Sequence, residues 1–175
     1  MNKRAILYSL CATAMAMSGL VLGAAPASAS IHNTPGYVHI ANEGSGKCID
    51  ATDAGAVQWR CLNTFNEEWQ FIDVYPEGLE IVSHSSGDCL TVADPSVDEF
   101  QNGTPVVLAP CAYSPFPWPM ITRGQTWFRN PDHPLVLVAG QGKCLDLENG
   151  DAHDGVPLQI WDCNYNTSNQ RWYRQ

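Results

Sequence analysis

The 175-residue chain is poor in charge, and above all in positive charge. Only 15% of its residues are charged, and nine Lys and Arg stand against 18 Asp and Glu, a net charge of −9. So acidic a chain repels phosphate backbones, which argues against a nucleic-acid partner. The chain also lacks any long stretch of helical periodicity after its first residues, while 14 Gly and 12 Pro favour strands and turns.

Acidic residues are absent from positions 1–29. This segment opens with Lys3-Arg4, is mainly apolar over Ala5–Leu22, and ends in Ala27-Ser28-Ala29. A basic start, an apolar middle and a small-x-small end predict a secretory signal peptide cleaved after Ala29. A transmembrane anchor is the alternative. The polar residues that interrupt the apolar run, and Pro26 after it, favour the signal peptide.

Without residues 1–29 the chain has 146 residues, a net charge of −11 and six of its seven cysteines. No second apolar stretch is long enough to cross a bilayer, so we expect a secreted, extracellular protein with no membrane insertion after signal cleavage. An even number of cysteines in an exported domain predicts three disulfides. Zinc ligation is the competing interpretation, but the sequence has neither Cys-x-x-Cys nor a Cys/His cluster. We predict no metal and no cofactor.

The six cysteines belong to three copies of one unit, spanning about 36–77, 78–131 and 132–175. Each copy has a Gly-x-Cys segment, a second cysteine, and a tryptophan that follows Gln or Glu by two positions. The cysteine pairs are Cys48 with Cys61, Cys89 with Cys111, and Cys144 with Cys163. The closing tryptophans Trp69, Trp127 and Trp172 are 58 and 45 residues apart, which places an insertion at 113–123.

Short apolar runs separated by Gly, Asn, Asp or Ser fill each unit and predict about four strands per copy. Three units that each expose an apolar face must close on one another. We therefore expect one closed barrel capped by hairpins, which removes most sheet edges. Each cysteine pair would join two neighbouring strands within a unit and stabilise the fold by about 2–4 kcal/mol.

Three units with Cys-x-Asp, Gln-x-Trp-x-Cys and Gln-x-Trp resemble the ricin B-type lectins, also called carbohydrate-binding module family 13. The resemblance extends over about residues 36–175 of a domain assigned to 30–175. It implies an all-β fold, a β-trefoil of three pseudo-symmetric four-strand repeats with intra-repeat disulfides. It also implies glycan or polysaccharide partners, often galactose or related sugars, with one shallow site available in each repeat.

The third repeat carries a full set of sugar-binding candidates: Asp146, Gln159, Trp161, Asn169 and Gln170. A sugar presents ring C–H faces and a rim of hydroxyls, so it needs an aromatic face and several hydrogen-bonding groups. Strand alternation points Gln159 and Trp161 to the same face. By resemblance, Asp146 accepts sugar hydroxyls, Trp161 stacks on the ring, Asn169 donates, Gln170 orients Asp146 or touches sugar, and Gln159 supports the pocket from behind. The alternative places Trp161 in the core and Asp146 in a turn.

The first repeat matches only in part, through Asp50, Trp59 and Asn66. Glu67 stands where Gln is expected, and Val57 occupies the position of Gln159. Gln58 should point to the other face unless a gap realigns it. Asp50 and Glu67 would repel each other or share a proton. The sequence favours neither an active nor an inactive sugar site in this repeat.

The second repeat lacks the set, with Thr91, Val107 and Ala109 at the positions of the acid, the amide and the aromatic. Gln125 and Trp127 persist nonetheless. We therefore predict that Gln-x-Trp serves the fold, with Trp69, Trp127 and Trp172 buried and each indole N–H donating to a partner.

Catalysis is not predicted. Asp50 and Asp146 occupy equivalent positions in different repeats, and pseudo-symmetry should hold them too far apart for a glycosidase pair. The five histidines show no ligand spacing and are expected on the surface or in turns. The leading hypothesis is a non-catalytic secreted lectin that binds mainly through the third repeat. The alternative is a protein-interaction or targeting subunit of a secreted complex, or a trefoil protease inhibitor, with Tyr113–Met120 as a protein-contact loop.

Overall fold

The computed structural model describes residues 34–74, 78–93, 99–112, 124–133, 137–139 and 142–175. These residues belong to one compact unit, Ile31–Gln175. The predicted signal peptide and the Tyr113–Met120 loop lie outside the described residues. In the described part of the chain, no helix has the length and apolar character needed to cross a membrane.

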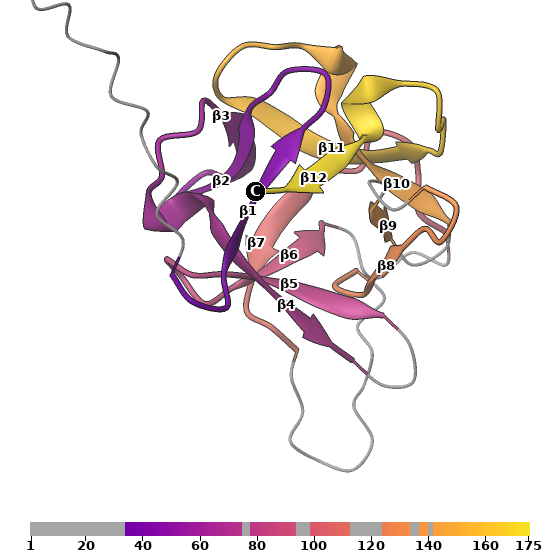
Figure 1. Cartoon of the computed structure of the whole chain (residues 1–175). Coiled ribbons are helices and arrows are strands. Elements are labelled where there is room, and N and C mark those ends of the chain that lie inside the picture. Colours follow the sequence, from indigo (N-terminus) through magenta and orange to yellow (C-terminus); the bar gives the residue numbers. More distant parts are fainter. Residues whose placement is uncertain (1–33, 75–77, 94–98, 113–123, 134–136, 140–141) are drawn as a thin grey trace, which may run out of the picture. The chain divides into compact units, whose positions relative to one another are not determined.

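The described residues form twelve strands, four in each repeat (Figure 1). The first repeat contains β1 (Val38–Asn42), β2 (Cys48–Thr52), β3 (Gly55–Trp59), the 3₁₀ helix η1 (Phe65–Glu67) and β4 (Glu68–Asp73). The second contains β5 (Leu79–Ser83), β6 (Cys89–Val92), β7 (Val106–Ala109) and β8 (Trp127–Arg129). The third contains β9 (Leu137–Ala139), β10 (Lys143–Leu147), η2 (Glu148–Gly150), β11 (Val156–Asp162), η3 (Ser168–Gln170) and β12 (Trp172–Arg174).

The strands pair antiparallel and the pairings close on themselves. Strand β4 joins β1 to β5, β8 joins β5 to β9, and the circuit returns to β1 through β10, β11, β3 and β2. Strand β12 also pairs with β1. The second and third strands of each repeat form the hairpins β2–β3, β6–β7 and β10–β11. Each repeat therefore contributes two strands to a barrel and one hairpin to its cap. This arrangement confirms the predicted all-β, three-repeat β-trefoil.

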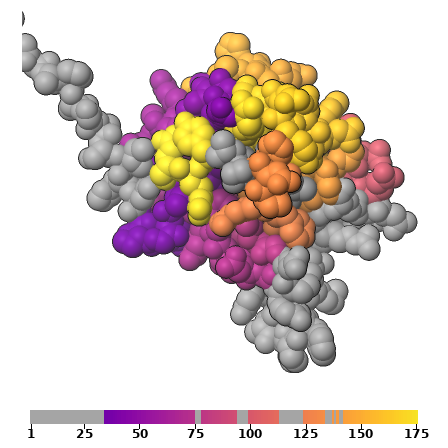
Figure 2. All heavy atoms as spheres, turned by 45° about the vertical axis from the view of Figure 1, so that its right-hand side comes forward, coloured from indigo at the N-terminus to yellow at the C-terminus, as the bar shows by residue number. Residues whose placement is uncertain are grey.

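The apolar faces of all three repeats meet in one core. Strand β11 alternates between the core and the surface: Leu158 and Ile160 are buried, whereas Trp161 is exposed. In Figure 2 the yellow C-terminal residues pack beside the indigo strand β1, in agreement with the β1–β12 pairing. The third and first repeats are thus neighbours.

The three repeat-closing tryptophans are buried in this core, at 0–3% exposure. Each indole N–H donates to the carbonyl oxygen of the residue after the first cysteine of its own repeat. The acceptors are Ile49 for Trp69, Leu90 for Trp127 and Leu145 for Trp172, at 2.9, 2.9 and 3.0 Å. The predicted structural role of Trp69, Trp127 and Trp172 is confirmed, because one indole serves the same hydrogen bond in all three repeats.

Three disulfides join the predicted pairs, Cys48–Cys61, Cys89–Cys111 and Cys144–Cys163. The first cysteine of each pair begins or lies in the second strand of its repeat, and the other follows the third strand by one or two residues. Each bridge therefore fixes the open end of one hairpin.

Candidate functional site

The β10–β11 hairpin brings together the two candidates that are 13 residues apart. In its register Asp146 lies opposite Gln159, and Cys144 lies opposite Trp161. Because side chains alternate along a strand, Gln159 and Trp161 lie on the outward face while Leu158 and Ile160 enter the core. The segment around η3 then supplies Asn169 and Gln170 from the end of the same repeat.

Asp146 is the centre of the site. The residue is 4% exposed, and its carboxylate accepts hydrogen bonds from three side-chain amides. Gln159 Nε2 donates to Oδ1 at 2.9 Å, while Asn169 Nδ2 and Gln170 Nε2 donate to Oδ2 at 2.7 and 2.9 Å. Burial raises the pKa of Asp146, and the Gln159 and Gln170 amides oppose that rise. The amides thus fix the position of an acid that its surroundings desolvate.

A pocket of about 450 Å³ opens over this carboxylate. All five candidates of the third repeat line it: Asp146, Gln159, Trp161, Asn169 and Gln170. Trp161 is 43% exposed and lines this pocket, so its indole offers an accessible apolar surface beside the polar groups. The structure therefore does not support the alternative in which Trp161 is a core residue and Asp146 a turn former.

Gly103, from the second repeat, lies close to the Trp161 indole. A Cβ built on Gly103 would lie 3.6 Å from the ring and 3.8 Å from Gln159 Oε1. Its φ of +84° favours glycine at this position. The Gly103 N–H also donates to the Ile160 carbonyl at 2.9 Å, which ties the second repeat to strand β11. Sequence reasoning missed this contribution, because it crosses between repeats.

Polar contacts next to Trp161 also join the second repeat to strand β11 of the third. Asn102 Nδ2 donates to Asp162 Oδ2 at 2.7 Å, and the Asp162 N–H donates to Asn102 Oδ1 at 2.8 Å. Lys143 Nζ donates to Asp162 Oδ1 at 2.6 Å and to Asn102 Oδ1 at 3.0 Å. The pKa of Asp162 is lowered, first by Lys143 and then by Asn102. We name Asn102, Lys143 and Asp162 the β11 clamp.

The first repeat has a different electrostatic environment around its acid. Asp50 is buried opposite Val57, which has no amide to donate. Burial raises the pKa of Asp50, the Glu67 carboxylate raises it further, and the Asn66 amide lowers it. A pocket of about 610 Å³ beside this repeat is lined by Asn66 but by neither Asp50 nor Trp59. The structure brings Asp50 and Asn66 together, without the amide set that surrounds Asp146.

The Glu67 side chain accepts hydrogen bonds from backbone N–H groups, as Gln125 and Gln170 do at the same position of the other repeats. It accepts from the Leu62 N–H at 2.9 and 2.8 Å and from the Asn63 N–H at 2.8 Å. Gln170 Oε1 accepts from the equivalent Asn164 N–H at 2.7 Å, and Gln125 Oε1 accepts from Ala112 N–H at 2.8 Å. The two glutamines also donate with Nε2, to Asp146 and to Thr91 Oγ1. A carboxylate has no such donor, so Glu67 performs only half of this role.

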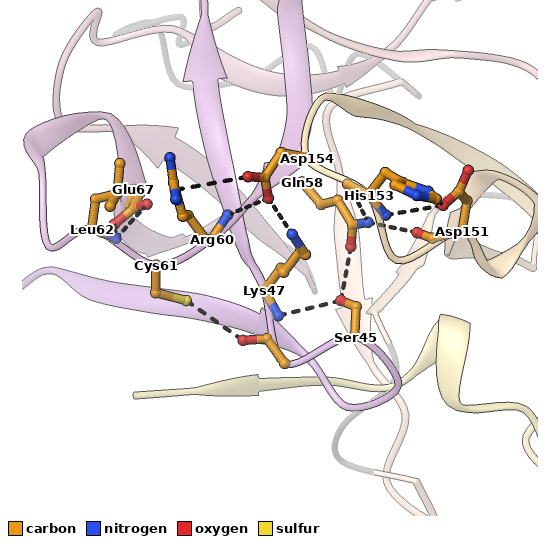
Figure 3. Close-up of polar contacts among 11 residues, drawn as sticks. Ser45, Lys47, Gln58, Arg60, Cys61, Leu62, Glu67, Asp151, His153 and Asp154 are labelled. Carbon is orange, nitrogen blue, oxygen red and sulfur yellow. Dashed lines mark hydrogen bonds and ion pairs between the residues drawn. The ribbon is translucent and has the colours of Figure 1, made fainter.

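Gln58 points away from the first-repeat site, and the realignment that would place it there is wrong. Its side chain is fully buried at the position that Ile160 occupies in the third repeat. Figure 3 shows Gln58 reaching the 151–153 loop, where Nε2 donates to the carbonyl oxygens of Asp151 and His153 at 2.5 and 2.7 Å. Its Oε1 accepts from Ser45 Oγ at 2.8 Å. Gln58 therefore joins the first repeat to the third.

The second repeat has no acid at the position of Asp146. Thr91 stands there, opposite Val107, and its Oγ1 donates to the Cys89 carbonyl at 2.8 Å. Gln125 Nε2 donates to the same Thr91 oxygen at 3.0 Å. The hairpin thus keeps the structural glutamine while it lacks both the carboxylate and the aromatic face.

One histidine differs from its predicted surface or turn position. His39 is fully buried in β1, and neither ring nitrogen has a hydrogen-bond partner among the described residues. Its Nδ1 lies 3.9 Å from Glu67 Oε2. Every residue of β1 from His39 onward is buried, so strand alternation in the sequence does not mark this histidine as buried.

The fold and the site define a class of protein: a β-trefoil whose third repeat brings together an acid, three amides and an exposed tryptophan, from the β10–β11 hairpin and η3. Residues 36–172 match the family of ricin-type β-trefoil lectin domains, and the chain belongs to this family.

Three solved structures illustrate the likeness. The designed threefold-symmetric protein ThreeFoil has a TM-score of 0.67 and 25% identity, over 79% of this chain and 97% of that one. A ricin B-like lectin from Macrolepiota procera, in complex with lactose, has a TM-score of 0.62 and 19% identity, over 83% and 98%. An exo-β-1,3-galactanase from Clostridium thermocellum has a TM-score of 0.67 and 22% identity, over 81% of this chain but 30% of the enzyme.

Proposed function

We propose that this lectin domain binds carbohydrate through the third repeat, with galactose-type sugars as its ligands. The observation that supports this most is the convergence of three amides on Asp146 beneath an exposed Trp161. A carboxylate offers about four acceptor positions. Three are filled by protein amides, which leaves one on Oδ1 for a sugar hydroxyl. The amides thereby orient the remaining acceptor before any ligand arrives.

Each neighbouring group has a role in this proposal. The exposed Trp161 indole stacks on the C–H face of the ring, and the ionised Asp146 accepts a hydroxyl in a charge-assisted bond. Gln159 and Gln170 are positioning residues, since both donate to Asp146. Asn169 sits at the edge of the pocket, where its amide binds Asp146 and can also meet sugar. The role is binding without catalysis.

We further propose that the domain acts outside the cell after removal of residues 1–29. The composition of that segment and the three disulfides support export, because disulfides persist in oxidising compartments.

The test is calorimetric titration of galactose, lactose, N-acetylgalactosamine and xylan fragments into the wild-type protein and Asp146→Ala. Lactose is the ligand of the M. procera lectin structure, and it ends in galactose. We expect at least one of these sugars to bind the wild type and Asp146→Ala to lose that binding. Circular dichroism and thermal unfolding establish that the variant is folded. A folded wild type that binds none of the probes would sink the proposal.

A further inference from the structure

We propose that the third-repeat site continues into a second pocket at the junction with the first repeat, and that its ligand is an oligosaccharide of at least two residues. This inference rests on the proposed function, because it extends the same site.

The second pocket has a volume of about 320 Å³ and adjoins the first. The pockets share three lining residues, Asn149, Thr167 and Asn169. Trp161 lines only the pocket described above, whereas Ser45 lines only the second. The shared residues therefore lie between the stacking surface and the β1–β2 turn. A sugar chain that begins over Trp161 and passes Asn169 would enter the second pocket.

The lining chemistry of the second pocket fits a neutral, hydroxyl-rich ligand. It is formed only by amides, hydroxyls and glycines: Asn42, Gly44, Ser45, Asn149, Gly150, Thr167, Ser168 and Asn169. None of these side chains is charged, aromatic or aliphatic. Such a surface can donate and accept hydrogen bonds around a ring without stacking on it. The first pocket thus supplies the aromatic face, and the second supplies further hydrogen-bonding groups.

Hydrogen bonds hold this second pocket in shape. Asn42 is fully buried and its Oδ1 accepts from the Gly44 and Ser45 N–H groups at 2.9 and 3.1 Å. Its Nδ2 donates to the Asn169 carbonyl at 3.1 Å, which fixes the β1–β2 turn against η3. Across the pocket, Asn149 has a left-handed φ of 56°. Asparagine adopts this conformation readily, so the backbone here turns without strain.

Asn42 therefore links the two repeats at the point where the two pockets meet. Thr167 Oγ1 donates to Asn169 Oδ1, so the residue that touches Asp146 also belongs to the second pocket. A ligand that spans both pockets would contact groups that are already ordered, which lowers the entropy cost of binding.

The experiment compares galactose with lactose, β-1,3-galactobiose and β-1,4-galactobiose by calorimetry. We expect at least one disaccharide to bind about tenfold more tightly than galactose, the gain that one or two added hydrogen bonds provide. Ser168→Leu fills the second pocket and should remove that gain without changing galactose affinity. Ser168→Ala, which is the milder change, should reduce the gain. Ser86→Leu is the matched control, since Ser86 lines the unrelated pocket beside Asn66.

A second readout does not depend on any variant. In amide NMR spectra of the wild type, the Gly44 and Ser45 signals should shift with the tighter disaccharide and stay in place with galactose. Galactose binding with every disaccharide within threefold of it would overturn the inference and leave the proposed function standing. So would a gain that survives in folded Ser168→Leu. If no sugar binds at all, the proposed function fails and this inference fails with it.

Discussion

The first and third repeats have the same hairpin register and differ in what surrounds the acid. Asp50 faces Val57 and lies near the Glu67 carboxylate, whereas Asp146 accepts from Gln159, Asn169 and Gln170. Glu67 and Gln170 nevertheless accept the same backbone N–H after the second cysteine of their repeats. A carboxylate at this position thus keeps the hydrogen bond to the backbone N–H. It lacks the amide N–H that in Gln170 donates to the acid of the site.

The largest expected effect comes from giving the third repeat the residue of the first. Gln170→Glu removes the amide that donates to Asp146 and to the Asp162 carbonyl, and it places two carboxylates side by side. We expect galactose affinity to fall about 30-fold at neutral pH, or roughly 2 kcal/mol, the value of a hydrogen bond to a charged group. Calorimetry at neutral pH measures this loss.

The matched control is Gln125→Glu, in the repeat where Thr91 replaces the acid. It changes the same structural position without placing a second carboxylate at the third-repeat site. We expect galactose affinity to stay the same while stability decreases. Equal losses of affinity in both variants would mean that Gln170 acts through the fold and not through Asp146.

The reverse change should build a site where the sequence has only part of one. Val57→Gln with Glu67→Gln gives Asp50 two amides in the positions of Gln159 and Gln170. Measured in an Asp146→Ala background, so that the third repeat is silent, galactose should bind about tenfold more tightly than in Asp146→Ala alone. The pKa of Asp50, followed by NMR titration, should decrease because the Glu67 charge is gone. No gain in binding despite that decrease would show that Trp59 is not placed to stack.

A smaller effect is expected from pH. Burial raises the pKa of Asp146, so this acid gains a proton at a higher pH than an exposed aspartate would. A protonated acid has fewer acceptor positions, and we expect galactose affinity to fall about threefold as the pH drops from neutral into this range. Titrations at a series of pH values test this. A decline that begins only near the ordinary value of about 4 would contradict it.

Stability should change with pH in the opposite direction. A pKa raised by folding means that the protonated form of Asp146 favours the native state. Its contribution is therefore full below the unfolded pKa and is lost as pH rises through the folded pKa. The unfolding free energy of the wild type, relative to Asp146→Asn, should decrease as pH rises from about 4 toward neutrality. Urea denaturation at each pH measures the difference.

Much of this molecule could be predicted from the sequence because it is repeated three times. The paired cysteines and the closing tryptophans recur in one register, so each copy supports the interpretation of the others, while strand alternation placed Gln159 and Trp161 on one face of the third repeat. Contacts between repeats could not be predicted in this way. Gly103 beside Trp161 and Gln58 on the 151–153 loop are each single residues whose partners lie across a seam. Contacts of this kind leave no periodic pattern in the sequence.

The smallest expected effect concerns the contacts between neighbouring repeats. Asn102 Oδ1, from the second repeat, accepts from the Asp162 N–H of the third repeat at 2.8 Å. Asp154 Oδ1, from the third repeat, accepts from the equivalent Arg60 N–H of the first repeat at 3.0 Å. Asn102→Ala should loosen the β11 clamp next to Trp161 and weaken galactose binding by about two- to threefold, since Lys143 still holds Asp162. Asp154→Ala opens the seam shown in Figure 3, away from Trp161, and should leave that affinity unchanged. Calorimetry on both variants decides whether the clamp positions the indole or only joins two repeats, because a purely structural contact would give the same small effect at either seam.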